Sequence, residues 1–160
     1  MIRTIMIAAL LAMGLSGAAI AADAPTDPQI AHIAYTAGQI DIAAAQQAIA
    51  KSKNADIVAF AKQMAEDHKA VNDQALALVK KLNVTPEDNP TSQALSKAAA
   101  DKLAELAKLD GAAFDKAYID NEVAYHKAVD AALSTTLIPA AQNAELKALL
   151  QQGLTLGTEH

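Results

Sequence analysis

The chain has 160 residues, no cysteine, no tryptophan and a formal net charge of −5 at pH 7. These features exclude disulfides and thiolate chemistry, and they provide no basic footprint for nucleic acid or for an anionic membrane surface. Aromatic residues make up only 3% of a chain rich in alanine, and because alanine has the highest helix propensity, the composition favours closely packed helices.

The first residues have the pattern of an export signal. Arg3 precedes an uncharged apolar run over residues 5–15, and small residues typical of a cleavage site follow up to Ala21. The run is short for a membrane span, which needs about 20 apolar residues. The sequence therefore predicts a signal peptide over residues 1–21 and a single exported domain over residues 22–160. The simplest destination is a bacterial periplasm, with no integral membrane span in the mature chain.

Two long helices are predicted at the start of this domain. Asp27 followed by Pro28 is typical of an N-cap with proline at the first helical position, and apolar residues then recur at helical spacing to about Lys51. Asn54 can cap a second helix whose apolar stripe reaches Leu82. Because the connection between them is so short, the two helices should be antiparallel neighbours.

Residues 83–110 form a long connection that contains a helix of its own. Two prolines interrupt the second helical pattern, and an amphipathic stretch follows over residues 92–108. At ~1.5 Å rise per residue this stretch would cover ~25 Å, enough to travel the length of a bundle. The next long helix would then start at the same end as the second one and run parallel to it.

The third long helix is predicted over residues 112–135, after a break at Gly111. Pro139 should end or turn the chain, and Asn143 can cap a last helix. The predicted fold class is therefore all-α. Its architecture is that of the ferritin-like four-helix bundle, with one long helical crossover between helices two and three.

A short repeat links the second and third long helices. The tetrapeptide His-Lys-Ala-Val begins at His68 and again at His126, 58 residues later (126 − 68). The flanks agree in kind, since Phe60 and Tyr118 lie eight residues before the two histidines. The chain thus resembles two copies of one helical hairpin. If the two helices run parallel, their histidines should lie at nearly the same height.

These histidines form the candidate site. His68 and His126 both fall on apolar stripes, and Glu122 lies one turn before His126 on the same face. Two imidazoles and a carboxylate inside a bundle are typical of a metal site, and by ligand type the candidates are Fe, Cu or Zn. The same histidines could instead be buried core residues satisfied by hydrogen bonds, with no metal bound.

Three further observations limit the candidate site. The residues three before His68 and His126 are Ala65 and Val123, so the Glu-x-x-His pairs of a di-iron oxidase or ferroxidase are missing. His32 lies among polar residues, so we expect it to be solvated. His160 falls on the inner side of the last helix, at a chain end that is expected to fray.

The motifs also resemble a known family, the exported bacterial "domain of unknown function 4142". The resemblance rests on Asp67-His68 with Asn72, on Phe114-Asp115-Lys116-Ala117-Tyr118, on His126, and on Leu146-Lys147 leading to His160. It covers the whole mature chain and implies a ferritin-like fold in the periplasm or at the envelope. It implies no activity, because none is established for the family.

The leading hypothesis is a non-enzymatic exported helical bundle that acts as a binding or stress-related module of the envelope, with a metal ion held by its inner histidines. A first alternative is a metal-dependent redox enzyme that uses His68, His126 and Glu122. A second is a purely structural bundle whose alanine-rich faces self-associate into a homo-oligomer. The sequence specifies no protein partner.

Overall fold

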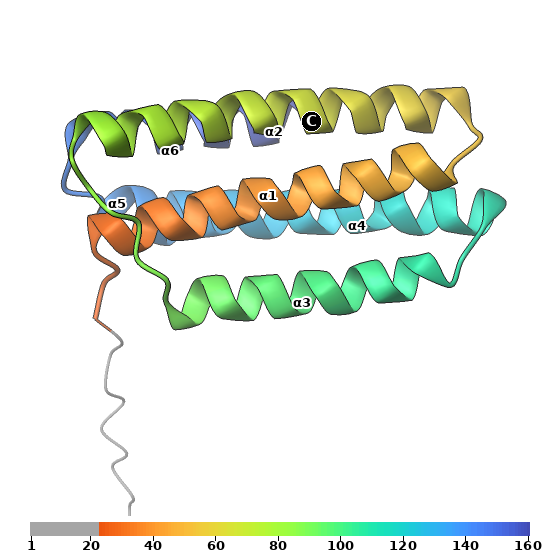
Figure 1. Cartoon of the computed structure of the whole chain (residues 1–160), viewed down its shortest axis with the longest axis horizontal. Coiled ribbons are helices and arrows are strands. Elements are labelled where there is room, and N and C mark those ends of the chain that lie inside the picture. The colour runs from red at the N-terminus through yellow and green to blue at the C-terminus, as the bar shows by residue number, and fades with distance from the viewer. Residues whose placement is uncertain (1–22) are drawn as a thin grey trace, which may run out of the picture.

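The structure, a computed structural model, describes residues 23–160, and this part of the chain is helical throughout, with no strand (Figure 1). It has five main helices: α1 (Asp27–Lys51), α2 (Ala55–Lys81), α3 (Pro90–Ala107), α4 (Gly111–Ala132) and α6 (Ala144–Glu159). A π-helical segment, η1 (Leu133–Leu137), and the short α5 (Ile138–Ala140) connect α4 to α6. The all-α prediction is confirmed. The predicted signal peptide lies outside the described residues.

The axes of the long helices lie nearly parallel to one another, although the chain runs in opposite directions along some of them (Figure 1). α1 and α2 form an antiparallel hairpin, and α3 then returns along the bundle, so that α4 begins at the same end as α2 and runs in the same direction. α6 runs back beside α2 and α4 and ends about halfway along them. The end of α6 therefore places its C-cap residue, His160, in the middle of the bundle.

The helix ends are mostly set by local side chains. Asn54 and Asn143 cap α2 and α6 as predicted. The N-cap of α1, however, is Thr26 and not Asp27, because Thr26 forms a reciprocal capping box with Gln29. Asp27 instead accepts hydrogen bonds from two backbone N–H groups before α6, at 2.8 and 2.9 Å. The start of α1 is thereby tied to the start of α6.

The prediction that the third long helix ends near Thr135 is wrong. The helical path continues through η1 and α5 as far as Ala140, and Pro139 lies within it. A π-helical turn changes the hydrogen-bond spacing just before the proline, and a proline is tolerated in the first turn of the helix that follows. The chain becomes extended only at Ala141.

Two apolar clusters fill the bundle, one in each half. The first contains Met64, Phe114 and Tyr118 with three alanines of α1 and Leu106 of α3. The second is formed mainly by α1, η1 and α6, with Ile30 at its centre. α3 thus contributes directly to the core, and polar side chains can occupy the interior at the level between the two clusters.

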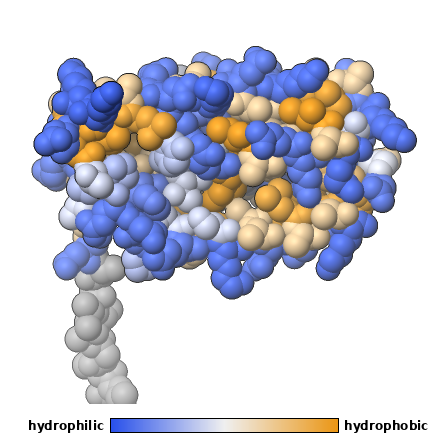
Figure 2. Space-filling view, in the orientation of Figure 1, coloured by the Kyte–Doolittle hydropathy of each residue, from blue (hydrophilic) through white to orange (hydrophobic). Residues whose placement is uncertain are grey.

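Most of the remaining surface is polar. Hydrophilic residues cover much of the face shown in Figure 2, with hydrophobic residues in separate groups among them. Leu76 and Val123 are the large apolar side chains that are about half exposed among the described residues. No helix within residues 23–160 combines the length and the hydropathy needed to cross a membrane.

The repeat has a structural counterpart. A shift of 58 residues, which carries His68 onto His126, also carries α2 onto α4 and α1 onto the crossover helix α3. The duplicated hairpins are therefore α1–α2 and α3–α4.

A close approach between α1 and α2 supports a first prediction. A Cβ atom at Gly38 would fall within 2.9 Å of the amide group of Asn72, whose Nδ2 donates to the carbonyl oxygen of Tyr35. We expect Gly38→Ala to lower the free energy of unfolding by about 1–3 kcal/mol, because the added methyl group overpacks this contact. Urea unfolding followed by circular dichroism measures the loss.

A matched control is available in α6. A Cβ atom at Gly153 would meet no atom within 4 Å, so Gly153→Ala should be neutral or stabilising by up to about 1 kcal/mol. Equal losses at the two glycines would contradict the packing described for Gly38.

Candidate functional site

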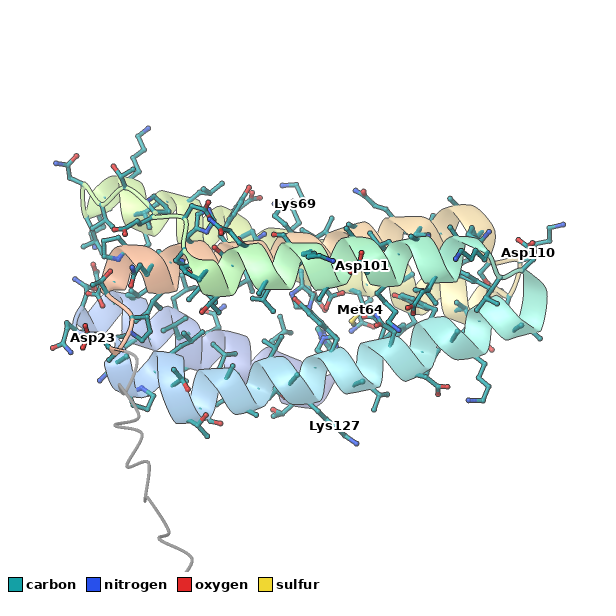
Figure 3. The ribbon with its side chains drawn as sticks, turned by 90° about the horizontal axis from the view of Figure 1, so that it is seen from below. Asp23, Met64, Lys69, Asp101, Asp110 and Lys127 are labelled. Carbon is teal, nitrogen blue, oxygen red and sulfur yellow. The ribbon has the colours of Figure 1, made fainter. Side chains whose placement is uncertain are left out.

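Polar side chains from four helices meet between the two apolar clusters. They are Asp41 of α1, His68 of α2, Glu122 and His126 of α4, and His160, the C-cap of α6. Figure 3 shows Met64, one turn before His68, pointing into the bundle, whereas Lys69 and Lys127 beside the two repeated histidines point outward. The repeated tetrapeptide therefore presents its histidine to the interior in both copies.

The ring nitrogens lie unusually close together. The Nε2 atoms of His68 and His126 are 3.4 Å apart, and Nδ1 of His160 is 3.4 Å from Nε2 of His126. Oδ2 of Asp41 lies 3.0 Å from Nε2 of His68 and 3.3 Å from Nε2 of His126. The prediction that the two repeated imidazoles meet at one height is confirmed.

Hydrogen bonds on the outer side define the tautomers of two rings. Nδ1 of His126 is 2.9 Å from the backbone carbonyl oxygen of Glu122, which can only accept, so Nδ1 carries the proton. Nε2 of His160 is 3.1 Å from a carboxylate oxygen of Asp67 and donates to it. In the neutral rings, Nε2 of His126 and Nδ1 of His160 therefore hold lone pairs that face each other. Two facing lone pairs repel unless a proton or a metal ion lies between them.

Two carboxyl groups are buried beside these rings. Asp41 and Glu122 are 1% and 2% exposed, and Oδ2 of Asp41 faces the Nε2 atoms of His68 and His126. Oδ1 of Asp41 is buried without a hydrogen-bond partner within the described residues. Burial, together with the charge of Asp41, raises the pKa of Glu122 to about 9, so Glu122 is protonated at neutral pH. Buried polar groups normally have partners, and this site has an excess of acceptors, which suits a cation.

Two tyrosines border the same region. Burial raises the pKa of both Tyr118 and Tyr125, and the nearby carboxyl groups add to the effect, so both phenols stay neutral. Tyr125 donates a hydrogen bond of 2.7 Å to the carbonyl oxygen of Ala37. These rings screen the buried carboxyl groups from water and supply no positive charge.

The structure brings the three predicted residues together and adds two that sequence reasoning did not assign. Glu122 offers an oxygen close to Asp41 and His126, and His68, His126 and His160 form a second group. Asp41 lies three residues before the buried Ala44, on the same face of α1, and this helical spacing is the signal that could have found it. The ring of His160 is only 3% exposed, so the expected fraying does not keep it out of the site.

The prediction that His32 is solvated is wrong. Nδ1 of its half-buried ring lies 2.9 Å from Oγ of Ser92, and Ser92 belongs to α3. The crossover helix covers the side of α1 that carries His32. This histidine stands apart from the cluster of the other three, which makes it a useful control.

The fold and the site thus define a helical protein with a buried cluster of histidine, aspartate and glutamate that could hold a metal ion. Over residues 12–160 the chain matches the model of the family described as "Domain of unknown function (DUF4142)", and it belongs to that family. Searches of curated proteins and of solved structures found no match.

Proposed function

We propose that the protein is a metal-binding helical module in which one divalent cation is held by His68, His126, His160 and Asp41. The observation that carries this proposal is the 3.4 Å approach of two ring nitrogens whose lone pairs face each other. Glu122, whose pKa burial raises to about 9 in the metal-free protein, lies beside these ligands.

The separations between the ligand atoms fit a small tetrahedral ion. With metal–nitrogen bonds of about 2.0–2.1 Å, the ligand atoms of a tetrahedral zinc site lie about 3.3–3.4 Å apart. Four of the six separations among the proposed ligand atoms range from 3.0 to 3.4 Å. His160 lies close to the other two histidines, and Asp41 lies close to His126 and Glu122. The imidazole-rich set suits zinc, copper and iron alike.

A hydrogen-bonded core without metal accounts less well for the distances between the ring nitrogens. A proton shared between two rings would bring their nitrogens to a hydrogen-bond distance of roughly 2.7–3.2 Å. The separations between the ring nitrogens are longer, at 3.4 Å in both pairs. One metal ion satisfies the facing nitrogens and the carboxylate of Asp41 together.

The test is a titration of the metal-free protein at pH 7.5 with Zn²⁺ and, separately, with Co²⁺. We expect one ion per chain in calorimetry, and an intense visible spectrum of the kind that tetrahedral Co²⁺ gives. No heat and no colour would refute the proposal. The redox alternative requires, in addition, turnover of peroxide or oxygen by the iron- or copper-loaded protein.

Another prediction concerns Asp67, a positioning residue that contacts the ring of His160. Its carboxylate fixes the tautomer of His160, and such outer partners typically change metal affinity by about 10–100-fold. We expect Asp67→Ala to weaken Zn²⁺ binding by that factor while the stoichiometry stays at one ion. Asp73→Ala, at an exposed position of the same helix, should leave the affinity unchanged. Equal effects of the two changes would contradict the role of Asp67.

Two broader aspects belong to the same proposal. The parallel course of α2 and α4, with α3 as the crossover (Figure 1), supports a ferritin-like arrangement with α3 added to the core. The apolar run after Arg3 supports export to the periplasm. Fractionation of expressing cells, with N-terminal sequencing of the mature chain, tests export. A start near residue 22 is expected, and an uncleaved cytoplasmic chain would contradict it.

A further inference from the structure

A cavity of about 980 Å³ adjoins the histidine cluster. It is lined by α1 from Gln29 to Asp41 and by side chains of α2, α4, η1 and α6. At ~1.5 Å rise per residue, its length along α1 is about 18 Å. Apolar residues, chiefly alanine and leucine, make up more than half of the wall, and Asp41, His68 and His126 contribute to it at the level of the cluster.

The space exists because small residues face it. α1 presents Ala34 and Ala37 to the cavity, and in α6 a Cβ atom at Gly153 would meet nothing within 4 Å. Pockets that bind small molecules are mostly apolar, with a few placed polar groups, and measure about 300–1,000 Å³.

The charges of the wall restrict the ligand. No lysine or arginine lines the cavity among the described residues, whereas Asp41 and Asp130 do. Each of these aspartates has a buried oxygen without a hydrogen-bond partner, and Asp41 is 1% exposed. A ligand that brings a hydrogen-bond donor and no negative charge would satisfy such oxygens, and an anion would be repelled.

We propose that this cavity binds an uncharged long-chain alcohol, with the alkyl chain along α1 and the hydroxyl group donating to the unpartnered carboxylate oxygens beside the histidines. The elongated shape fits an extended chain, and the apolar wall buries it. The acceptors at the polar end select a hydroxyl head over a carboxylate head. This inference is independent of the proposed metal ion, because Asp130 remains available when a cation occupies Asp41.

The test uses calorimetry with 1-decanol and, separately, with decanoate, on the metal-free protein in chelator. We expect 1-decanol to bind once per chain and decanoate to bind at least tenfold more weakly. Failure of 1-decanol to bind, or equal binding of decanoate, would overturn the proposal. The metal titration is a separate measurement, so either proposal can fail without the other.

Filling the cavity locates the bound ligand. Gly153→Leu places a side chain in the open space, and it should weaken 1-decanol binding at least tenfold. Ala148→Leu, at an exposed position of the same helix outside the cavity, should leave binding unchanged. If Gly153→Leu does not fold, Leu149→Phe, at another lining position, takes its place. Unchanged binding in the filled variant would place the alcohol elsewhere and overturn the proposal.

Discussion

Replacing His126 with alanine is expected to weaken Zn²⁺ binding by at least a factor of about 100, which is roughly 2.7 kcal/mol of binding free energy. Nε2 of His126 lies within 3.4 Å of a nitrogen of His68, a nitrogen of His160 and an oxygen of Asp41. This nitrogen lies close to all three of the other proposed ligands. Its loss removes one ligand directly and leaves the remaining ones without a common centre.

Calorimetry on the metal-free variant measures this effect, and circular dichroism checks that the helices are intact. His32→Ala is the matched control, because this ring contacts Ser92 of α3 and lies outside the cluster. We expect that control to bind Zn²⁺ as the original chain does. A His126→Ala protein that is folded and still binds at full affinity would rule out the assigned ligand set.

The second large effect concerns Glu122 and pH. In the folded protein its pKa is raised from the ordinary 4.5 to about 9, mainly by burial and then by the charge of Asp41. Between these two values the folded state holds a proton that the unfolded state releases. The free energy of unfolding therefore falls as pH rises through this window, by up to about 1.4 kcal/mol per pH unit.

Glu122→Gln removes this dependence, because its neutral amide takes the place of the protonated carboxyl group. We expect the metal-free variant to match the original chain near pH 4.5 and to be more stable at pH 8, by something on the order of 1–3 kcal/mol. Urea unfolding at both pH values, with chelator present, measures the difference. The comparison of two chains cancels the titration of the other groups.

Glu66→Gln, at an exposed position of α2, is the control for this experiment. Its effect should stay within about 0.5 kcal/mol at both pH values, as surface changes usually do. A Glu122→Gln protein that is less stable than the original chain at pH 8 would show that the glutamate is charged and favourably paired there.

Helix boundaries could be predicted from the sequence wherever local chemistry sets them. Asn54 and Asn143 cap their helices through their own side chains, and such bonds involve residues only two or three positions apart. The two wrong predictions of helix boundaries also concern interactions between residues close in sequence. Thr26 competes successfully with Asp27 for the N-cap through Gln29, and the π-helical turn before Pro139 leaves no simple trace in apolar spacing.

The candidate site could be predicted in part. His68 and His126 were found because the repeat and the helical spacing place both on inward faces at matching heights, and Glu122 followed from its position one turn earlier. Asp41 and His160 were not assigned. Their roles depend on the relative height of α1 and on where α6 ends beside α4, and no short-range pattern encodes either.

By itself the sequence determined that the chain is helical, where most helices begin, and which histidines face inward, because capping bonds and side-chain periodicity act over a few residues. The tertiary structure alone decided that four helices bring three imidazoles and a buried carboxylate within 3.0–3.4 Å of their neighbours, and that α3 covers His32. It also decided that a cavity opens beside them. These features depend on how whole helices are shifted and rotated against each other. Those shifts follow from the summed packing of distant side chains.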